Sequence, residues 1–419
     1  MKLKICLILL ICSLISAAGF LTYKAAFKKD ANQTISLIQS GFSKVNKLYS
    51  PTPSKNSAST SRQTSTSTCN PTPKASNSPT FILSTATPEV LKEDLKIIAV
   101  GDILLGRGVG ARLEKQKKGY LYPFEKVKPI LKQGDVIFGN LEESITNSNK
   151  SLDERGKIVL KNSSKAFEGI KDAGFNLLNL ANNHIMDYYD KGLIDTINLL
   201  NKNGIAHAGA GKNLDEARKM AIIEKNNLKI GLLSYTDMSD ILYRGNPYIR
   251  FKAGSNNSGV APRELKYIMD DIKNNKSGVD LLIVSLHWGK EESFDILPEQ
   301  VQFAHTLLDA GADLILGHHP HQFQGIEIYN GKPIVYSMGN FIFDQNDPEN
   351  QESFILNMGF NKNKLINFSL TPVKTINKIQ VAPQKGDGAN EMLLREDELC
   401  KKLGSNCYLE DDKVVFKLK

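Results

Sequence analysis

Three of the seven histidines lie within four residues, in the stretch Gly317-His318-His319-Pro320-His321. The apolar run Asp313–Leu316 before them, bounded by Ala-Asp and Gly, is typical of a buried strand. His319 and His321 are two residues apart, so in extended backbone both rings would project to one side. Imidazole is the commonest protein metal ligand near neutral pH. The pattern favours a metal site at the end of a strand; a polar turn whose histidines cap a neighbouring helix is the alternative.

Other oxygen and imidazole donors follow four more apolar runs: Asp102, Asn140 with Glu142, Asn183 with His184, and His287. Ligands of open α/β sheets bind beyond the carboxyl ends of the strands, so these side chains are expected to share one site. Carboxylate, amide and imidazole together suit a dinuclear hydrolytic centre, in which a bridging carboxylate holds two cations that activate water for displacement at phosphorus. The mixture does not select among Mn, Zn and Fe, so we expect one or two divalent ions of this group.

Strands and helices alternate along the chain, which predicts an α/β fold with a partly parallel sheet. The strands are expected at residues 95–102, 135–142, 280–289 and 313–316, and within 175–184, where a strand is followed by a polar cluster at its C-terminal end. Helices are expected at 122–132, 165–173, 192–203, 262–274 and 298–310. Hairpins are expected at 220–236 around Asn226-Asn227 and at 325–343 around Asn330-Gly331. After about residue 350 the sequence predicts strands and an acidic helix near 391–403, without a readable motif.

The net charge of +8 is concentrated at the N-terminus, where residues 1–94 hold 11 Lys and Arg against 4 Asp and Glu. The remaining body is close to neutral, which argues against a nucleic-acid partner.

Ile5–Tyr23 has no charged residue and is long enough to span a bilayer. We expect residues 1–29 to be an uncleaved signal anchor rather than a cleaved signal peptide. Residues 30–90 are low-complexity and rich in Ser, Thr and Pro, typical of a disordered stalk. A single-pass protein of the cell membrane, with its body outside the cytoplasm, is the resulting expectation.

Six motifs in order are recognisable: Gly101-Asp102, Asn140-Leu141-Glu142, Ala181–His184, Ser285–Gly289, Gly317–His321 and Tyr336–Phe341. Together they resemble the CapA family of capsule synthesis proteins, the poly-γ-glutamate biosynthesis proteins, over roughly residues 95–345. That family is similar in turn to the calcineurin-like metallophosphoesterases. The resemblance implies a four-layer α/β sandwich with mixed sheets and two metals, formed by residues 91–345, with residues 346–419 as a C-terminal extension packed on it.

The resemblance also assigns roles. Asp102 matches the first-strand aspartate of the superfamily, and His184 matches the histidine used in acid–base work. The expected catalytic residues are His184 and Asp102, and the expected metal ligands are Asp102, Glu142, Asn183, His287, His319 and His321. Residues expected to bind substrate or to support these ligands are Asn140, Arg107, His318 and Asn340.

Two departures from the superfamily pattern concern the metals. Its first motif is Asp-x-His, but Ile103 and Leu104 follow Asp102, so one ligand is missing. Gly134-Asp135 is similar to its second motif, but Asp135 begins its strand, and Glu142 at the strand's end is the better bridging candidate. Whether one or two ions bind therefore stays open.

Two functions remain. The first is a membrane-anchored, metal-dependent hydrolase serving surface polymer production, acting on a phosphate ester or on the amides of polyglutamate. The second is a non-catalytic assembly or export factor that binds an anionic polymer or the subunits of a polymer synthase. The histidines at 287, 319 and 321 favour the first, whereas the missing histidine and the anchor with its stalk favour the second.

Overall fold

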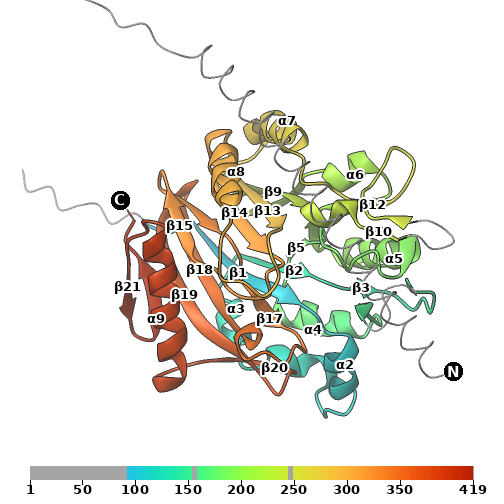
Figure 1. The fold of residues 1–419 in the computed structure, drawn as a ribbon, viewed down its shortest axis with the longest axis horizontal. Coiled ribbons are helices and arrows are strands. Elements are labelled where there is room, and N and C mark those ends of the chain that lie inside the picture. The colour runs from blue at the N-terminus through green and yellow to red at the C-terminus, as the bar shows by residue number, and fades with distance from the viewer. Residues whose placement is uncertain (1–91, 153–157, 244–248, 419) are drawn as a thin grey trace, which may run out of the picture. The chain divides into compact units, whose positions relative to one another are not determined.

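The computed structural model describes residues 92–152, 158–243 and 249–418, which belong to one compact unit (Figure 1). The predicted anchor, residues 1–29, and the predicted stalk, residues 30–90, lie outside the described residues. Within the described part of the chain, no helix is both long enough and apolar enough to cross a bilayer.

The larger of two sheets has the strand order β21-β22-β19-β18-β1-β2-β5-β6, with β17 beside the end of β1 and β20 beside β19. The run β1-β2-β5-β6 is parallel, whereas β18 and β19 are antiparallel to their neighbours, so the sheet is mixed. Its strands are β1 Leu95–Ile103, β2 Val136–Leu141, β5 Leu177–Asn179, β6 Ala206–Ala208, β17 Asn340–Ile342, β18 Glu352–Asn361, β19 Lys364–Ile376, β20 Gln380–Pro383, β21 Cys407–Glu410 and β22 Lys413–Phe416.

The smaller sheet has the order β15-β16-β14-β13-β9-β8, and its four inner strands are parallel. Its strands are β8 Ala221–Lys225, β9 Leu228–Thr236, β13 Leu281–His287, β14 Leu314–His318, β15 Ile326–Tyr329 and β16 Lys332–Val335. Each edge strand joins its neighbour through a two-residue turn with positive φ, at Asn226-Asn227 and at Asn330-Gly331, as those sequences predict.

Alternation along the strands sorts the side chains into layers. On β1, Ile97 and Ala99 point into the core between the sheets, whereas Ile98 and Val100 point to the helices outside. On β13, Ile283 points inward and its neighbours point outward. The larger sheet is covered by α2 Arg107–Leu113, η1 Gly119–Phe124, α3 Lys128–Leu131, α4 Ala166–Ala173 and α5 Tyr189–Lys202; the smaller is covered by α6 Leu214–Arg218, α7 Leu265–Asn275 and α8 Pro298–Asp309. The predicted α/β fold with mixed sheets is confirmed, and its layers are helices, sheet, sheet and helices.

The last helix, α9 Asp387–Lys402, packs against β19, β21 and β22 and adds apolar side chains to the core between the sheets. The chain at its end runs along the edge strand β15. There the Ile326 N–H donates to Cys400 Sγ at 3.2 Å, and the Ile328 N–H donates to Ser405 Oγ at 3.0 Å. These contacts occupy an edge that could otherwise pair with another chain. The predicted domain boundary at residue 345 falls inside the larger sheet, which β18 and β19 complete.

Two local predictions were wrong. The predicted helix 122–132 is two short helices, η1 and α3, because Pro123 and Pro129 lack the amide that a continuous helix needs there. The predicted hairpin 325–343 ends at Val335, and β17 crosses to the larger sheet to pair with β1. The crossing requires glycine on both sides: Gly339 has φ 67°, and a Cβ on Gly101 would lie 1.8 Å from the Gly339 carbonyl oxygen.

Helix α9 contains a buried carboxyl group, that of Glu396. Its burial predicts that the stability of the protein depends on pH. Burial raises the pKa of Glu396 well above its ordinary value, and its Oε2 has no hydrogen-bond partner among the described residues. In the unfolded chain the same group ionises near pH 4.3. The stability that the protonated form contributes is therefore complete below that pH and is lost as the pH rises toward the folded-state pKa.

Glu396→Gln keeps the shape of the side chain but cannot ionise. We expect it to stabilise the protein at pH 8 by roughly 1–3 kcal/mol, with little effect at pH 4, measured by thermal unfolding at both pH values. Glu391→Gln, at an exposed position of the same helix, is the control and should change stability at neither pH. If the stabilities of wild type and Glu396→Gln changed with pH in parallel, this carboxyl would not be protonated in the folded protein.

Candidate metal centre

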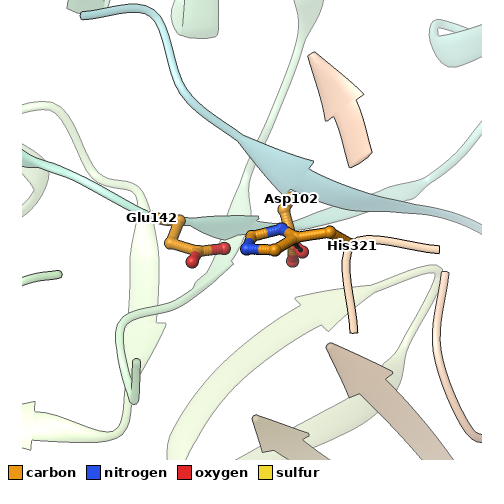
Figure 2. Close-up of side chains that lie close together, drawn as sticks. All are labelled: Asp102, Glu142 and His321. Atoms are coloured by element: carbon orange, nitrogen blue, oxygen red, sulfur yellow. Dashed lines mark ion pairs between the residues drawn. The ribbon is translucent and has the colours of Figure 1, made fainter. Parts of the chain in front are cut away.

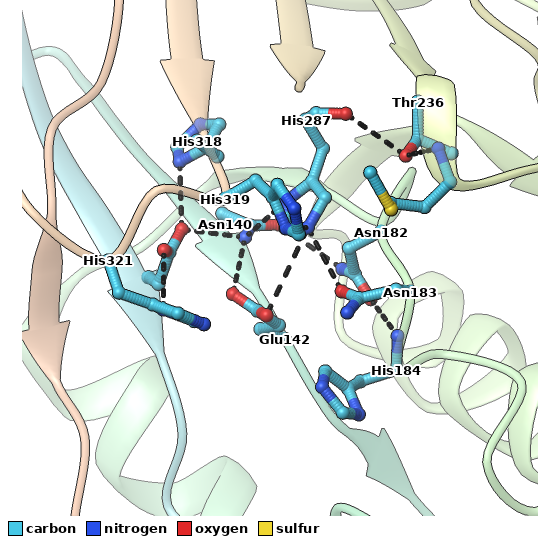
Figure 3. A network of polar contacts seen from close by, with 12 residues as sticks. Asn140, Glu142, Asn182, Asn183, His184, Thr236, His287, His318, His319 and His321 are labelled. Atoms are coloured by element: carbon cyan, nitrogen blue, oxygen red, sulfur yellow. Dashed lines mark hydrogen bonds and ion pairs between the residues drawn. The ribbon is translucent and has the colours of Figure 1, made fainter. Parts of the chain in front are cut away.

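The polar ends of six strands meet at one edge of the sandwich. Three of them stand side by side in the larger sheet, Asp102, Asn140 and Asn179, and three in the smaller, Thr236, His287 and His318. The two rows touch across the space between the sheets, where His318 Nδ1 lies 3.1 Å from Asp102 Oδ1 and His287 Nδ1 lies 3.4 Å from Asn140 Nδ2 (Figure 3). Register within each sheet therefore brings together residues that lie up to 216 positions apart in the chain.

Asn140 holds two buried carboxylates in fixed positions. Its amide nitrogen donates to Asp102 Oδ1 at 2.8 Å and to Glu142 Oε2 at 3.2 Å. Its amide oxygen accepts hydrogen bonds from Asn179 at 2.8 Å and from Asn182 at 3.1 Å, which fixes the orientation of the amide. Each carboxylate consequently has one oxygen occupied by Asn140 and one oxygen directed elsewhere.

The remaining oxygens, Asp102 Oδ2 and Glu142 Oε1, accept no hydrogen bond in the described part of the chain, although both residues are fully buried; Asp102 Oδ2 faces His321 Nδ1, 3.5 Å away. The two carboxylates share a locus with His321, because one ligand atom from each of the three residues lies within 4.8 Å of the others (Figure 2). His321 Nδ1 donates to Asn340 Oδ1 at 2.9 Å, the outer hydrogen bond typical of a metal-ligating histidine. Leaving buried carboxylate oxygens unpaired is costly, and a divalent cation fits these donors.

A second group of donors surrounds His287 Nε2. Asn183 Oδ1 lies 3.0 Å from that nitrogen, His319 Nδ1 lies 3.2 Å from it, and Glu142 Oε1 lies 4.0 Å from it. One amide oxygen, two imidazole nitrogens and a carboxylate oxygen form a donor set that suits Zn, Mn or Fe. Since Glu142 belongs to both groups, it occupies the bridging position.

The two carboxylates have opposite pKa shifts. Burial raises the pKa of Glu142 well above its ordinary value, and the charge of Asp102 raises it further. Burial also acts to raise the pKa of Asp102, but its contacts with His318 and His321 outweigh burial and hold that pKa well below its usual range. Two carboxylates that share one locus cannot both ionise easily without a cation, and the opposite directions of these shifts follow from that.

The imidazoles that would ligate the second ion are neutral near pH 7. Burial, followed by the neighbouring His319, lowers the pKa of His287 well below its ordinary value. Burial and the charge of His321 lower the pKa of His319 to about 4. Neutral imidazole is the form that binds metals. The pKa of His321 is instead raised to about 9, because its contact with Asp102, 3.5 Å away, and the charge of Glu142 outweigh burial.

The backbone of the histidine loop differs from the sequence expectation. His319 has φ 99° and His321 has φ 61°, so the stretch is not extended, and that prediction was wrong. The loop turns sharply after β14, and both rings still reach the site, with their centroids 6.3 Å apart. Positive φ at a residue with a side chain costs about 1–3 kcal/mol and persists only where surrounding contacts impose it. One such contact is the hydrogen bond from the Glu292 N–H to the Pro320 carbonyl, at 2.9 Å.

His184 lies beside Asn183 (Figure 3). Its ring is held by an aspartate that sequence reasoning missed. His184 Nδ1 lies 2.7 Å from Asp187 Oδ2, and this oxygen also accepts the Leu160 N–H at 2.7 Å. Asp187 is fully buried, so the imidazole keeps a fixed orientation with Nδ1 engaged. The signal available in the sequence was an acidic residue three positions after the motif histidine.

Arg107 lies at the rim of the site and does not contact the cluster. Its guanidinium pairs with Asp344 through two nitrogens, and its Cζ lies 5.7 Å from the centre of the Phe343 ring. That ring lies 5.0 Å from the His321 ring. A substrate group would therefore have to compete with Asp344 for Arg107, which was expected to bind substrate.

Comparison with known proteins identifies the family. The sequence model of the family described as "Bacterial capsule synthesis protein PGA_cap" matches residues 96–345. The chain is 35% identical over 318 residues to the "PGA biosynthesis protein CapA" of Bacillus subtilis, covering 76% of this chain and 80% of that protein. It is 34% identical over 268 residues to the "Capsule biosynthesis protein CapA" of Bacillus anthracis, covering 63% of each. A solved hypothetical protein from Thermus thermophilus aligns with a TM-score of 0.41 at 12% identity, over 67% of this chain and 99% of that one. On the family match and the extent of the Bacillus subtilis alignment, the chain belongs to the bacterial capsule synthesis protein family, as its six motifs predict.

Proposed function

We propose that the chain is a metal-dependent hydrolase acting on a phosphate ester in the production of an anionic surface polymer, anchored in the cell membrane by residues 1–29. The observation that carries the proposal is the pair of buried oxygens, Asp102 Oδ2 and Glu142 Oε1, which accept no hydrogen bond among the described residues and lie among amide and imidazole donors. The name of the Bacillus subtilis relative, a PGA biosynthesis protein, supports poly-γ-glutamate as the polymer. Synthase subunits are the partners that this role implies.

The donor set divides between two ions. Asp102, Glu142 and His321 would hold one, and the group around His287 Nε2, sharing Glu142, would hold the other. When bound, such a pair lowers the pKa of a water molecule and neutralises charge on the phosphate. The protein's own part is to keep both carboxylates and the neutral imidazoles in place before the ions arrive.

His184 is the proton donor to the leaving group in this proposal. Asp187 engages Nδ1, so the opposite nitrogen, Nε2, is the atom from which a proton would pass to the leaving oxygen. His184 is the most exposed of the expected catalytic residues and metal ligands, although only 8% of its surface is accessible, which suits a group that must meet substrate. General acid catalysis of this kind contributes about 10²–10⁴-fold to rate.

A non-catalytic polymer-binding role is the second candidate, and one observation favours it. Ile103 and Leu104, at the positions that follow Asp102 in the Asp-x-His pattern, are fully buried apolar residues and offer no ligand. The first ion would therefore have three protein donors. Weak binding there would leave a site with one ion and little hydrolytic power.

The experiment that decides uses the full-length chain in detergent. We expect metal analysis by mass spectrometry to find one or two divalent ions per chain, and an aryl phosphate to be hydrolysed until a chelator is added. Asp187→Asn should keep its metal and lower kcat by about 100-fold, with an altered pH profile, because His184 loses its fixed orientation.

Asp190→Asn, at an exposed position of the following helix, is the matched control and should behave as wild type. A chain that holds its metal but shows no chelator-sensitive turnover would support the polymer-binding role. A chain that takes up no metal after reconstitution with Mn or Zn would overturn the proposed hydrolase.

A further inference from the structure

Positive charge is concentrated in one short segment of the folded body. Residues 106–132 contain eight Lys and Arg against two Glu, whereas the whole body from residue 95 to 419 contains 42 against 41. The segment comprises α2, η1 and α3 and lies on the outer face of the larger sheet. The rest of the body therefore has a slightly negative net charge, whereas this segment has a positive one.

Most of these cations are directed to solvent. Three of the eight have ion-pair partners, in Arg107–Asp344, Lys118–Glu125 and Lys128–Asp172. The other five are exposed and have no ion pair among the described residues; we call them the basic strip: Arg112, Lys115, Lys117, Lys126 and Lys132. Like charges gathered without counter-charges repel one another, so an anionic partner would relieve that repulsion.

The chain segment that carries the basic strip begins beside the metal centre. Helix α2 follows directly on β1, the strand that carries Asp102, and its first residue, Arg107, is one ring away from His321 through Phe343. From there the chain passes through η1, which packs against α4, and through α3 to the start of β2 (Figure 1). The five cations thus lie along a path that leads away from the site over the outer helices.

We propose that the basic strip binds a linear polycarboxylate chain and leads it to the metal centre; the link to that centre rests on the proposed function. Four of the five cations are lysines, flexible point charges that pair with anionic groups at variable spacing, as along a linear polycarboxylate. A membrane-binding face would expose an apolar surface, but Leu121 is the one large hydrophobic side chain exposed in the described segment 106–132.

The test measures binding of a fluorescent γ-linked glutamate oligomer of about 20 residues to the full-length protein by anisotropy, at several salt concentrations. The strip variant carries Lys115→Gln, Lys117→Gln, Lys126→Gln and Lys132→Gln. We expect it to bind about 30-fold more weakly, with a shallower dependence on salt, because four exposed charges are lost. Its metal content and its action on a small aryl phosphate should equal those of wild type.

The control variant loses the same charge at exposed lysines outside the strip, through Lys212→Gln, Lys219→Gln, Lys229→Gln and Lys273→Gln, and should bind as wild type. Equal weakening in both variants would overturn the proposal, because net charge alone would then explain binding. A polyphosphate of matched charge, or anionic phospholipid vesicles, binding more tightly than the oligomer in a strip-dependent way would also overturn it. If the protein bound the oligomer through the basic strip but did not hydrolyse the aryl phosphate, the proposed hydrolase would be rejected and the proposed role of the basic strip would stand.

Discussion

His319→Ala is expected to remove most of the metal-dependent activity while leaving the metal-free protein folded. His319 Nδ1 is one of three atoms within 4.0 Å of His287 Nε2, so the second donor group loses a third of the atoms around that nitrogen. Altering even a residue that only supports a ligand commonly costs 10–100-fold in metal affinity or activity, so for a ligand we expect at least ~100-fold. The metal-free protein should change little, because the ring lost is neutral near pH 7 and contributes no ion pair there.

Thermal unfolding with and without metal measures this directly. A cation at 100 times its Kd stabilises the wild type by about 2.7 kcal/mol, which raises its melting temperature by several degrees, and His319→Ala should lose most of that rise. His305→Ala is the control: this histidine pairs with Glu327 away from the site, so the rise with metal should persist. A full rise in His319→Ala would show that the second donor group does not bind metal.

Asn140→Asp should make folding depend on the cation. The substitution removes the donor shared by Asp102 and Glu142 and places a third carboxylate within about 3 Å of both. An uncompensated buried charge costs about 3–5 kcal/mol. We expect the metal-free variant to melt far below wild type at pH 7 and to recover much of the difference when divalent metal is added, because the ions neutralise the carboxylates.

Asn350→Asp provides the comparison, because Asn350 is also buried and donates to an amide, Gln345, rather than to carboxylates. Its loss of stability should be smaller and should not respond to metal. Equal losses in the two variants, both unaffected by metal, would mean that Asn140 does not hold the two carboxylates apart.

The location of the site could be predicted from the sequence because polar residues end successive parallel strands. That reasoning placed Asp102, Glu142 and His287 at one edge, and the structure brings them together there. Two further features predicted local structure: a glycine after a helix predicted the C-terminal end of α4, and Asn-Gly predicted the turn between β15 and β16. All of these signals are local, and each acts within a few residues.

The rest depends on contacts that no local pattern records. Asn140 looked like one more polar residue at a strand end, but its role comes from register with Asp102 and from the amides of Asn179 and Asn182. Asp187 is recognisable only once the fold directs it toward His184. The crossing of β17 between sheets could not be read from a segment that looks like the second arm of a hairpin, because it depends on close approach to Gly101.

The position of β1 has a consequence for folding during synthesis. Leu95, at the start of the strand that carries Asp102, pairs with Phe360, so one side of this strand stays bare until the ribosome has made β18. Pairings between such distant parts of a chain close slowly. We therefore expect synthesis to be almost finished before the nascent chain can acquire metal. Until then the unpaired edge of β1 must be kept from pairing with other chains.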